Sequence, residues 1–261
     1  MIKVKDLTKK FNGFTAVNNI SFNVNRGEIF AFLGPNGAGK TTTIKMMITL
    51  LSLTSGQIIL NGYDVLTQPD KVRRSFGIVF QDQSLDEELT ALENMEFHGV
   101  LYNVPKKVRK ERTEELLKIV ELWDRRNDYV KKFSGGMKRR LEIARGFLHH
   151  PKVLFLDEPT LGLDPQTRKN IWSYIKNLNE KEGITIFFTT HYIEEAGKIA
   201  GQIAIINEGK IVIQGSPKEL IDKTSASSLE DAFIKLTGHR IRNEQASGVD
   251  RMRMMRRVHR R

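Results

Sequence analysis

The chain has 261 residues, of which 39% are hydrophobic, and it carries a formal net charge of +11. That length and apolar content are enough for one sizeable globular core, with room for a subdomain. The absence of cysteine excludes disulfides and thiolate metal sites. No apolar run approaches the roughly 18–20 residues of a membrane-spanning helix, and the opening residues lack the apolar block of a secretory leader. We therefore expect any membrane-spanning part of the system to belong to another chain.

The positive charge is unevenly distributed along the chain. Residues 240–261 hold eight arginines and two acidic residues, which is +6 of the net charge, so the body is only moderately basic. This charge alone does not favour nucleic-acid binding, and we expect none. In the last eleven residues, Met254, Met255 and Val258 fall on one side of a helical wheel and most arginines on the other. The tail from residue 239 is interpreted as flexible and solvated, with contact to anionic lipid as the alternative.

The first third of the chain predicts a strand-rich segment. Asn12-Gly13 is typical of a turn between two strands, and Phe11 lies beside it. A short apolar strand is followed by a glycine-rich turn and then by apolar residues at helical spacing. A later apolar strand ends at Gln81. Strands are expected at 1–7, 19–24, 28–33, 57–60 and 76–80, and a helix at 40–51.

The glycine-rich turn fits the phosphate-binding pattern G-x-x-x-x-G-K-[ST] with the residues Gly34, Pro35, Asn36, Gly37, Ala38, Gly39, Lys40 and Thr41. Strand, turn and helix follow one another as the mechanism requires. Glycines allow the backbone N–H groups to turn inward, and the helix N-terminus adds positive potential. Lys40 is expected to reach the β- and γ-phosphates, and the Thr41 hydroxyl is expected to hold Mg²⁺.

Residues 84–150 are interpreted as a mainly helical insert between the strands of the nucleotide-binding core. Thr90-Ala91-Leu92-Glu93 is a capping-box pattern, and Pro105 suits the first turn of a second helix. Ser134-Gly135-Gly136 precedes a third helix, and this Ser-Gly-Gly segment is a candidate second anion site because a helix N-terminus exposes backbone donors. The helices are expected at 90–102, 105–122 and 138–145.

Acidic residues and a histidine follow two further apolar strands. Asp157-Glu158 comes at the end of the strand at 152–157, and His191 follows the strand at 184–188. Open α/β sheets bind ligands at the carboxyl ends of their strands, and two adjacent acids there are costly unless they bind a cation or do chemistry. Beyond these strands we expect a helix at 165–178, a hairpin at 202–206 and 210–214, and helices at 217–223 and 228–237.

The motifs of this chain, taken in sequence order, resemble those of the ATP-binding cassette (ABC) ATPases over about residues 2–237. The motifs are the phosphate-binding turn, Gln81, the Ser-Gly-Gly segment, Asp157-Glu158, Leu163-Asp164 and His191. Finer resemblance is to drug-resistance-type exporter subunits, carried by the stretches 86–90, 158–165 and 229–233. The resemblance implies an α/β fold with a P-loop NTPase (RecA-like) core, an antiparallel β subdomain and an inserted helical subdomain, all within a domain at 1–238.

The resemblance also implies a role for each motif. Phe11 would stack on adenine, and residues from Gly34 to Thr42 would wrap the phosphates. Thr41, Gln81 and Asp157 would hold Mg²⁺, while Glu158 would act as general base and His191 would contact the γ-phosphate. Asp164 would lie at a dimer seam, and Ser134, Gly135 and Gly136 would complete the ATP site of the opposing subunit. Such in-trans donors suit a phosphoryl transfer that depends on positioning and charge stabilisation.

The function implied is an ATPase subunit that powers an exporter through ATP-driven dimer closure. Its partners would be a polytopic permease on another chain and a second cassette, most simply a copy, at the inner face of the membrane. The surface near Gln81 and residues 82–104 is the expected docking region. A soluble ABC ATPase of the cofactor-assembly type remains the alternative. The segment also departs from the common L-S-G-G-Q pattern, because Phe133 and Met137 stand at its ends and a thioether lacks the hydrogen bonds of a glutamine amide.

Overall fold

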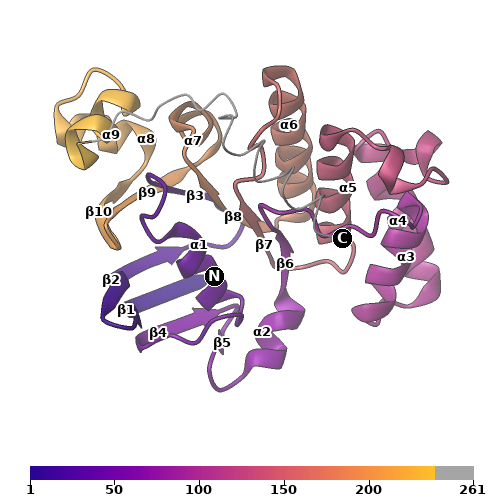
Figure 1. The fold of residues 1–261 in the computed structure, drawn as a ribbon, viewed down its shortest axis with the longest axis horizontal. Helices are drawn as coiled ribbons and strands as arrows, with labels where there is room; N and C mark the ends of the chain where they lie inside the picture. The colour runs from indigo at the N-terminus through magenta and orange to yellow at the C-terminus, as the bar shows by residue number, and fades with distance from the viewer. Residues whose placement is uncertain (239–261) are drawn as a thin grey trace.

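The computed structural model describes residues 1–238, and the arginine-rich tail lies outside the described residues. The strands form two sheets, a four-stranded antiparallel sheet in the order β2-β1-β4-β5 and a six-stranded sheet in the order β10-β9-β3-β8-β7-β6. Figure 1 shows the antiparallel sheet at one corner of the molecule and the six-stranded sheet at its centre. The strands are β1 (Ile2–Phe11), β2 (Phe14–Val24), β3 (Ile29–Leu33), β4 (Ser55–Leu60), β5 (Tyr63–Asp64), β6 (Phe76–Val79), β7 (Val153–Asp157), β8 (Thr185–Thr190), β9 (Gln202–Asn207) and β10 (Lys210–Gly215).

The antiparallel sheet has one buried face and one exposed face. Along β1, Ile2 and Val4 are buried while Lys3 and Lys5 are exposed, the alternation that a half-buried strand requires. The pairing of β1 with β2 slips after Val4, so the alternation breaks in the second half of the strand. That break explains why the sequence pattern predicted strand only as far as residue 7, although β1 continues to Phe11.

The central sheet places the carboxyl ends of its parallel strands at one edge. Strands β6, β7, β8, β3 and β9 are parallel neighbours, and β10 is antiparallel to β9. Every residue of β7 and β8 is buried, as expected for strands covered on both faces. Because Asp157 is the register partner of Thr189 and Leu33 of Thr190, the residues that follow these strands converge. The predicted site residues after three of the strands are therefore neighbours in space.

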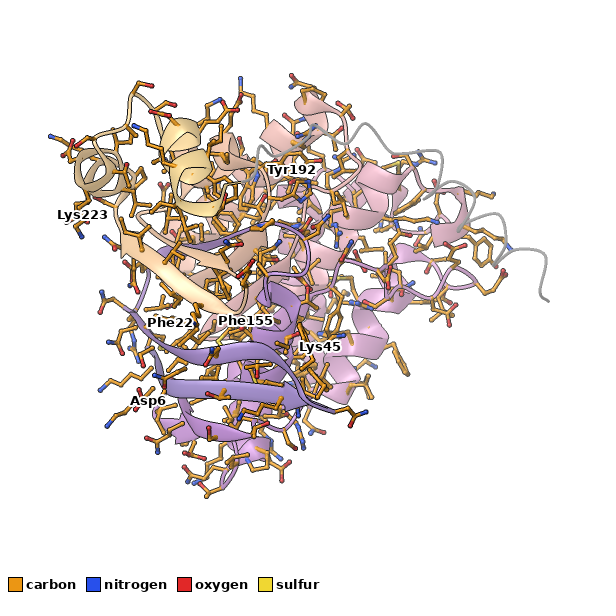
Figure 2. The ribbon with its side chains drawn as sticks, turned by 60° about the vertical axis from the view of Figure 1, so that its left-hand side comes forward. Asp6, Phe22, Lys45, Phe155, Tyr192 and Lys223 are labelled. Atoms are coloured by element: carbon orange, nitrogen blue, oxygen red, sulfur yellow. The ribbon has the colours of Figure 1, made fainter. Side chains whose placement is uncertain are left out.

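A layer of phenylalanines joins the two sheets. Phe22 of β2 stacks on Phe30 of β3 with ring centroids 5.7 Å apart, and Phe30 stacks on Phe187 of β8 at 5.5 Å. Phe155 of β7 lies 5.6 Å from Phe187. Figure 2 shows Phe22 and Phe155 inside the molecule. Rings in this arrangement contribute roughly 0.5–1.5 kcal/mol per pair beyond their buried area, so the layer fixes the antiparallel sheet against the central one.

The helices surround the central sheet. Three of them (α3, α4 and α5) lie in sequence between β6 and β7 and stand away from the antiparallel sheet in Figure 1, as predicted for the helical insert. None of the helices within residues 1–238 is both long enough and apolar enough to span a bilayer. The helices are α1 (Lys40–Met47), α2 (Pro69–Ser75), α3 (Ala91–Leu101), α4 (Lys106–Ile119), α5 (Gly135–Phe147), α6 (Pro165–Glu182), α7 (Ile193–Ile199), α8 (Pro217–Thr224) and α9 (Leu229–Thr237), with single 3₁₀ turns at Trp123–Arg125 and Val130–Lys132.

Several predicted helix limits were wrong. The first helix ends at Met47 rather than residue 51, and Thr49 beyond it adopts a left-handed φ of 65°. Helix α6 continues past residue 178 to Glu182, where Gly183 caps it in the left-handed conformation. The short helices α2 and α7 were not predicted, because seven residues are too few to display a helical period. The capping box at Thr90 was predicted correctly.

Candidate active site

The glycine-rich turn is held by its neighbours on two sides. Its residue Gly39 has φ 105°, and a Cβ built there would lie 2.6 Å from the carbonyl oxygen of Ala16 in β2. The Gly209 N–H, in the turn between β9 and β10, donates to the Ala38 carbonyl at 3.0 Å. Only glycine fits such a position without strain. The turn is therefore preformed against both sheets at the N-terminus of α1, where helical N–H groups and the dipole favour an anion.

Lys40 is buried at the start of α1 and directs its ammonium group into the site. Its Nζ donates to the carbonyls of Gly34 at 2.8 Å and Pro35 at 3.1 Å, and lies 3.4 Å from Glu158 Oε1. Burial lowers the pKa of Lys40, while the negative charge of Glu158 opposes that shift. The ammonium group is thus hydrogen-bonded to backbone oxygens beside the space that a phosphate would occupy.

Asp157 receives two hydroxyl groups at the end of β7. Its Oδ1 accepts from Thr189 at 2.5 Å and from Thr41 at 3.3 Å. Burial raises the pKa of this carboxyl, and the two hydroxyl donors only partly offset that effect. A buried carboxylate beside a threonine hydroxyl presents the hard oxygen ligands that Mg²⁺ prefers, usually with water and substrate phosphates completing the set. These residues therefore fit a magnesium ion.

Glu158 and His191 form a buried pair beside Lys40. His191 Nδ1 lies 2.6 Å from Glu158 Oε2, and both side chains are 9% exposed. Burial disfavours the charged carboxylate, but the hydrogen bond from His191 and the charge of Lys40 outweigh it and hold the pKa of Glu158 below its ordinary value. Glu158 is thus ionised at neutral pH, as a general base must be. The other ring nitrogen of His191, Nε2, is buried and has no hydrogen-bond partner among residues 1–238.

The backbone at Glu158 is strained, and β8 holds it in place. Its φ of 50° lies in the left-handed region, which costs a residue with a Cβ roughly 1–2 kcal/mol. Its N–H donates to the carbonyl and hydroxyl oxygens of Thr189 at 3.2 and 3.1 Å. This turn sets the Glu158 carboxylate beside Lys40 and His191, while Asp157 faces Thr41. Strain held by neighbouring structure is common at functional sites.

The backbone around Gln81 is fixed by two buried charged residues of α5. Arg139 donates to the carbonyls of Phe80 at 2.6 Å and Gln81 at 3.2 Å, and it pairs with Glu142 at 3.1 Å. Glu142 in turn accepts the Ser84 N–H at 2.7 Å. The Gln81 side chain itself is exposed. The segment is therefore held by its main chain, and its amide is free to face a ligand.

The remaining predicted residues lie outside this cluster. The Ser-Gly-Gly segment opens α5, where the Ser134 hydroxyl accepts the Met137 N–H at 3.3 Å and both Ser134 and Gly135 are exposed. Asp164 caps α6 and is exposed. Phe11 is 42% exposed, with Lys9 Nζ 4.8 Å from its ring centroid. One chain thus brings together Lys40, Thr41, Asp157, Glu158 and His191 beside the glycine-rich turn, while Phe11, Ser134, Gly135 and Asp164 are exposed at its surface.

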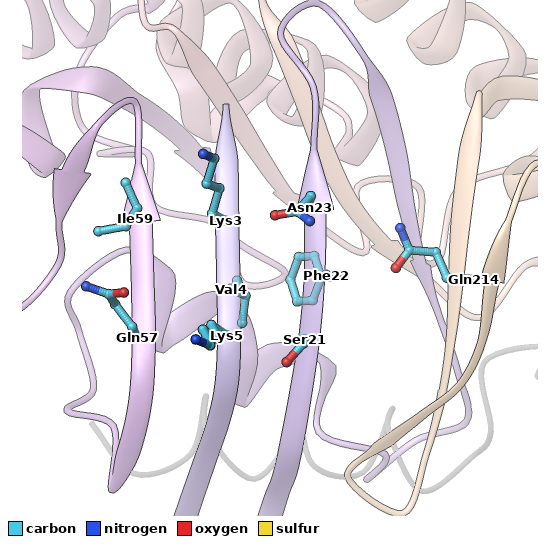
Figure 3. A pocket seen from close by; sticks show the side chains of 9 residues that line it. All are labelled: Lys3, Val4, Lys5, Ser21, Phe22, Asn23, Gln57, Ile59 and Gln214. Atoms are coloured by element: carbon cyan, nitrogen blue, oxygen red, sulfur yellow. The ribbon is translucent and has the colours of Figure 1, made fainter.

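A separate hollow of about 460 Å³ lies on the antiparallel sheet and contains no predicted site residue (Figure 3). It is lined by two lysines, four other polar residues and three apolar residues of β1, β2, β4 and β10. Its lining residues are Lys3, Val4, Lys5, Ser21, Phe22, Asn23, Gln57, Ile59 and Gln214.

Three residues that sequence reasoning missed take part in or support the site. Thr189 binds Asp157, Arg139 holds the Gln81 main chain, and Glu195 of α7 accepts the Thr160 hydroxyl at 2.8 Å. The threonines at the end of β8 gave a signal, because polar residues at a strand's carboxyl end face the site. The other two gave none, since a charged residue on a helix usually faces solvent.

A preformed glycine-rich turn with a buried lysine, and two acids at the carboxyl edge of a parallel sheet, define a P-loop nucleoside triphosphatase. A family model described as "ABC transporter" matches residues 17–161. The chain belongs to this family, and it is an ATPase that uses ATP with Mg²⁺.

The curated relatives agree with this assignment. The chain is 39% identical over 237 residues to the linearmycin resistance ATP-binding protein of Bacillus subtilis, covering 91% of this chain and 75% of that protein. It is 40% identical over 238 residues to the daunorubicin/doxorubicin resistance ATP-binding protein of Streptomyces peucetius, covering 91% and 70%. The predicted resemblance to drug-resistance-type subunits is thus confirmed.

Solved structures confirm the predicted fold class. An ATP-binding subunit of an ABC transporter superposes with a TM-score of 0.82 at 30% identity, covering 90% of this chain and 99% of that one. A dimeric ATP-binding cassette in a post-hydrolysis state, bound to ADP and Pi, superposes with a TM-score of 0.74 at 30% identity, covering 83% and 98%.

Proposed function

We propose that this chain is the ATP-hydrolysing subunit of an ABC exporter and that two cassettes close around ATP at their interface. The catalytic cluster of Lys40, Glu158 and His191 is assembled within one chain, whereas the Ser-Gly-Gly segment is exposed at the start of α5. A second chain is the natural source of the missing anion donors. We further propose that residues 1–238 form the ATPase domain, with a helical insert at about 84–150, and that residues 239–261 are a separate tail.

Each residue of the cluster has a separate role in ATP hydrolysis. Lys40 leaves the carbonyls of the glycine-rich turn and binds the β- and γ-phosphates, which Gly34 to Thr42 enclose. Asp157, Thr41 and the Gln81 amide would hold Mg²⁺, which when bound would neutralise charge on the phosphate oxygens. Glu158, ionised and oriented by His191, accepts a proton from the attacking water.

His191 serves the γ-phosphate through its second nitrogen. Because Nδ1 faces the Glu158 carboxylate at 2.6 Å, Nε2 is directed to other partners and donates a hydrogen bond when the ring carries both protons. A buried nitrogen without a protein partner costs free energy unless a ligand satisfies it. A phosphate oxygen at this position would satisfy it and stabilise the charge that develops during transfer.

The second cassette is most simply another copy of this chain. Each copy would then supply Ser134, Gly135 and Gly136 to the ATP site of the other, and Asp164 would lie at the seam. The dimeric relative bound to ADP and Pi supports this arrangement. Phe11 would stack on adenine, which requires Lys9 to leave its ring. Met137 provides no amide for a polar contact there, so we expect slower turnover than a glutamine would give.

The membrane partner is expected to dock on α3. Phe97, Val100 and Leu101 are 61%, 51% and 62% exposed, and this helix follows the Gln81 segment directly. An exposed apolar patch of this kind marks an interaction site. A polytopic permease on another chain would place the cassette at the inner face of the membrane. The antibiotic-resistance names of the relatives support export of a drug-like compound and disfavour the soluble, cofactor-assembly alternative.

The docking face is tested by Leu101→Glu, with Leu50→Glu as control, because both leucines are 62% exposed and lie in different parts of the fold. We expect tagged wild type and Leu50→Glu to co-purify with a polytopic membrane protein from detergent-solubilised membranes of the source cell. Leu101→Glu should lose that protein and keep its ATPase activity in isolation. Co-purification with soluble assembly factors instead would contradict the exporter assignment.

A further inference from the structure

Two chain segments that leave neighbouring strands are joined by a part-buried hydrogen bond. The Thr160 hydroxyl lies 2.8 Å from both carboxylate oxygens of Glu195. Thr160 is 1% exposed and belongs to the segment that runs from Glu158 to Asp164. Glu195 lies in the first turn of α7, four residues after His191. Burial raises the pKa of Glu195, and the Thr160 hydroxyl is the first of the groups that oppose this shift.

A second contact joins the same two segments nearer to Asp164. Arg168 of α6 donates from Nε to the Leu163 carbonyl at 2.9 Å, and its guanidinium lies 4.4 Å from the centroid of the Tyr192 ring. Tyr192 follows His191 directly. The 160–164 segment is therefore linked to the residues that flank His191 directly at Thr160 and through Arg168 at Leu163.

His191 is the group most sensitive to such a shift. Its Nδ1 contacts Glu158 at 2.6 Å and its Nε2 is the nitrogen left for a ligand. Hydrogen bonds are effective over only a few tenths of an ångström, about 2.7–3.2 Å for nitrogen donors. A misplacement near 1 Å can cost about 10²-fold in rate. A displacement of the 160–164 segment that reached His191 would therefore change the hydrolysis rate.

We propose that Thr160 and Glu195 are positioning residues that relay contact at the 160–164 segment of a closed dimer to His191. The inference rests on the proposed function, because it takes Asp164 to lie at the seam and His191 to contact the γ-phosphate. In an isolated chain no partner contacts the 160–164 segment, so it is not displaced. In the dimer the partner presses on the exposed end of the segment, and the Thr160–Glu195 hydrogen bond carries that displacement to α7 and His191.

The test is Thr160→Val, which keeps the shape of the side chain and removes the hydroxyl. We expect kcat to fall about 10-fold or more, with KM for ATP within about twofold because the phosphate-binding turn is untouched. Thr160→Ser, which restores the hydroxyl, should recover most of kcat. Glu195→Ala removes the acceptor, together with its 3.5 Å contact to the Thr190 hydroxyl, and should give at least the same loss, so it stands in if the valine variant does not fold. Glu194→Ala is the matched control, since that neighbouring carboxylate is exposed.

A positioning role is separated from a structural one by repeating the measurement in a His191→Ala background, with single-turnover assays in excess enzyme. If Thr160 acts through His191, Thr160→Val should change the residual rate less than about twofold there. An equal loss in both backgrounds, or an unchanged kcat in the wild-type background, would overturn the proposal. Failure of the proposed function would look different, because wild type itself would then hydrolyse no ATP or Glu158→Gln would hydrolyse it normally.

Discussion

Gly39→Ala should strongly destabilise the phosphate-binding turn. The new Cβ would lie 2.6 Å from the Ala16 carbonyl oxygen, about 0.8 Å closer than the ordinary contact limit of 3.4 Å. Ala16 has little freedom to retreat, because the neighbouring Asn18 N–H donates to Gly209 at 2.8 Å and β2 is paired with β1. The left-handed φ of 105° adds roughly 1–2 kcal/mol, and the steric overlap adds about 1–3 kcal/mol. We expect the free energy of unfolding to fall by about 2–5 kcal/mol in total.

Gly37→Ala is the control for this prediction. Gly37 lies in the same turn with φ 80°, but a Cβ there would meet no atom of the described part of the chain within 4 Å. The control should lose only the conformational part, about 1–2 kcal/mol. Urea denaturation without nucleotide, followed by circular dichroism, gives both values. Equal losses for the two variants would refute the argument that contact with β2, rather than backbone conformation, fixes the turn.

Three further predictions test the charges of the site and its surroundings. Lys40→Met should cost about 2–5 kcal/mol of ATP-binding free energy, measured by calorimetric titration, whereas Lys45→Met, exposed on the same helix, should change it little. Arg139→Met should lower the free energy of unfolding by about 3–5 kcal/mol because it leaves Glu142 buried without its ion-pair partner. Adding Glu142→Leu should recover at least half of that loss, and no recovery would argue against the ion pair. Burial lowers the pKa of His149 from 6.5 to about 4. Between these pH values the unfolded chain binds a proton at His149 and the folded chain does not. The free energy of unfolding must therefore fall as the pH falls. His149→Gln, which can still donate to the same backbone carbonyl, should reduce that slope by about 1.4 kcal/mol per pH unit, as pH-dependent urea denaturation would show; an unchanged slope would mean that His149 titrates normally.

The parts of the site that the sequence predicted are those built from residues adjacent in the chain. The glycine-rich turn, the Asp157-Glu158 pair and His191 each follow an apolar strand directly, so strand patterning alone places them at a common edge. The two acids can also be recognised as functional candidates from the sequence alone, since adjacent carboxylates at the end of a buried strand cost free energy unless they have a function.

The parts that could not be predicted depend on which elements become neighbours. Nothing in the sequence near Arg139 shows that it will meet the carbonyl of Gln81, 58 positions away. The Thr160–Glu195 contact depends in the same way on β7 and β8 being adjacent in the sheet. Charged residues on helices usually face solvent, so only the packed fold reveals that Arg139 is buried and that Glu195 has a partner. The helix limits failed for a local reason, because the left-handed turns at Thr49 and Gly183 set them.

We propose that ATP is enclosed between two chains and hydrolysed with Glu158 as base. Light scattering of Glu158→Gln, which keeps the side-chain shape and removes the base, tests it most directly, with wild type and the Glu158→Gln/Ser134→Arg double variant as controls. We expect a stable dimer with ATP and Mg²⁺ that is absent with ADP and absent in the double variant. A Glu158→Gln protein that binds ATP and remains a monomer would contradict the homodimer, and one that hydrolyses ATP at the wild-type rate would contradict the assignment of the base.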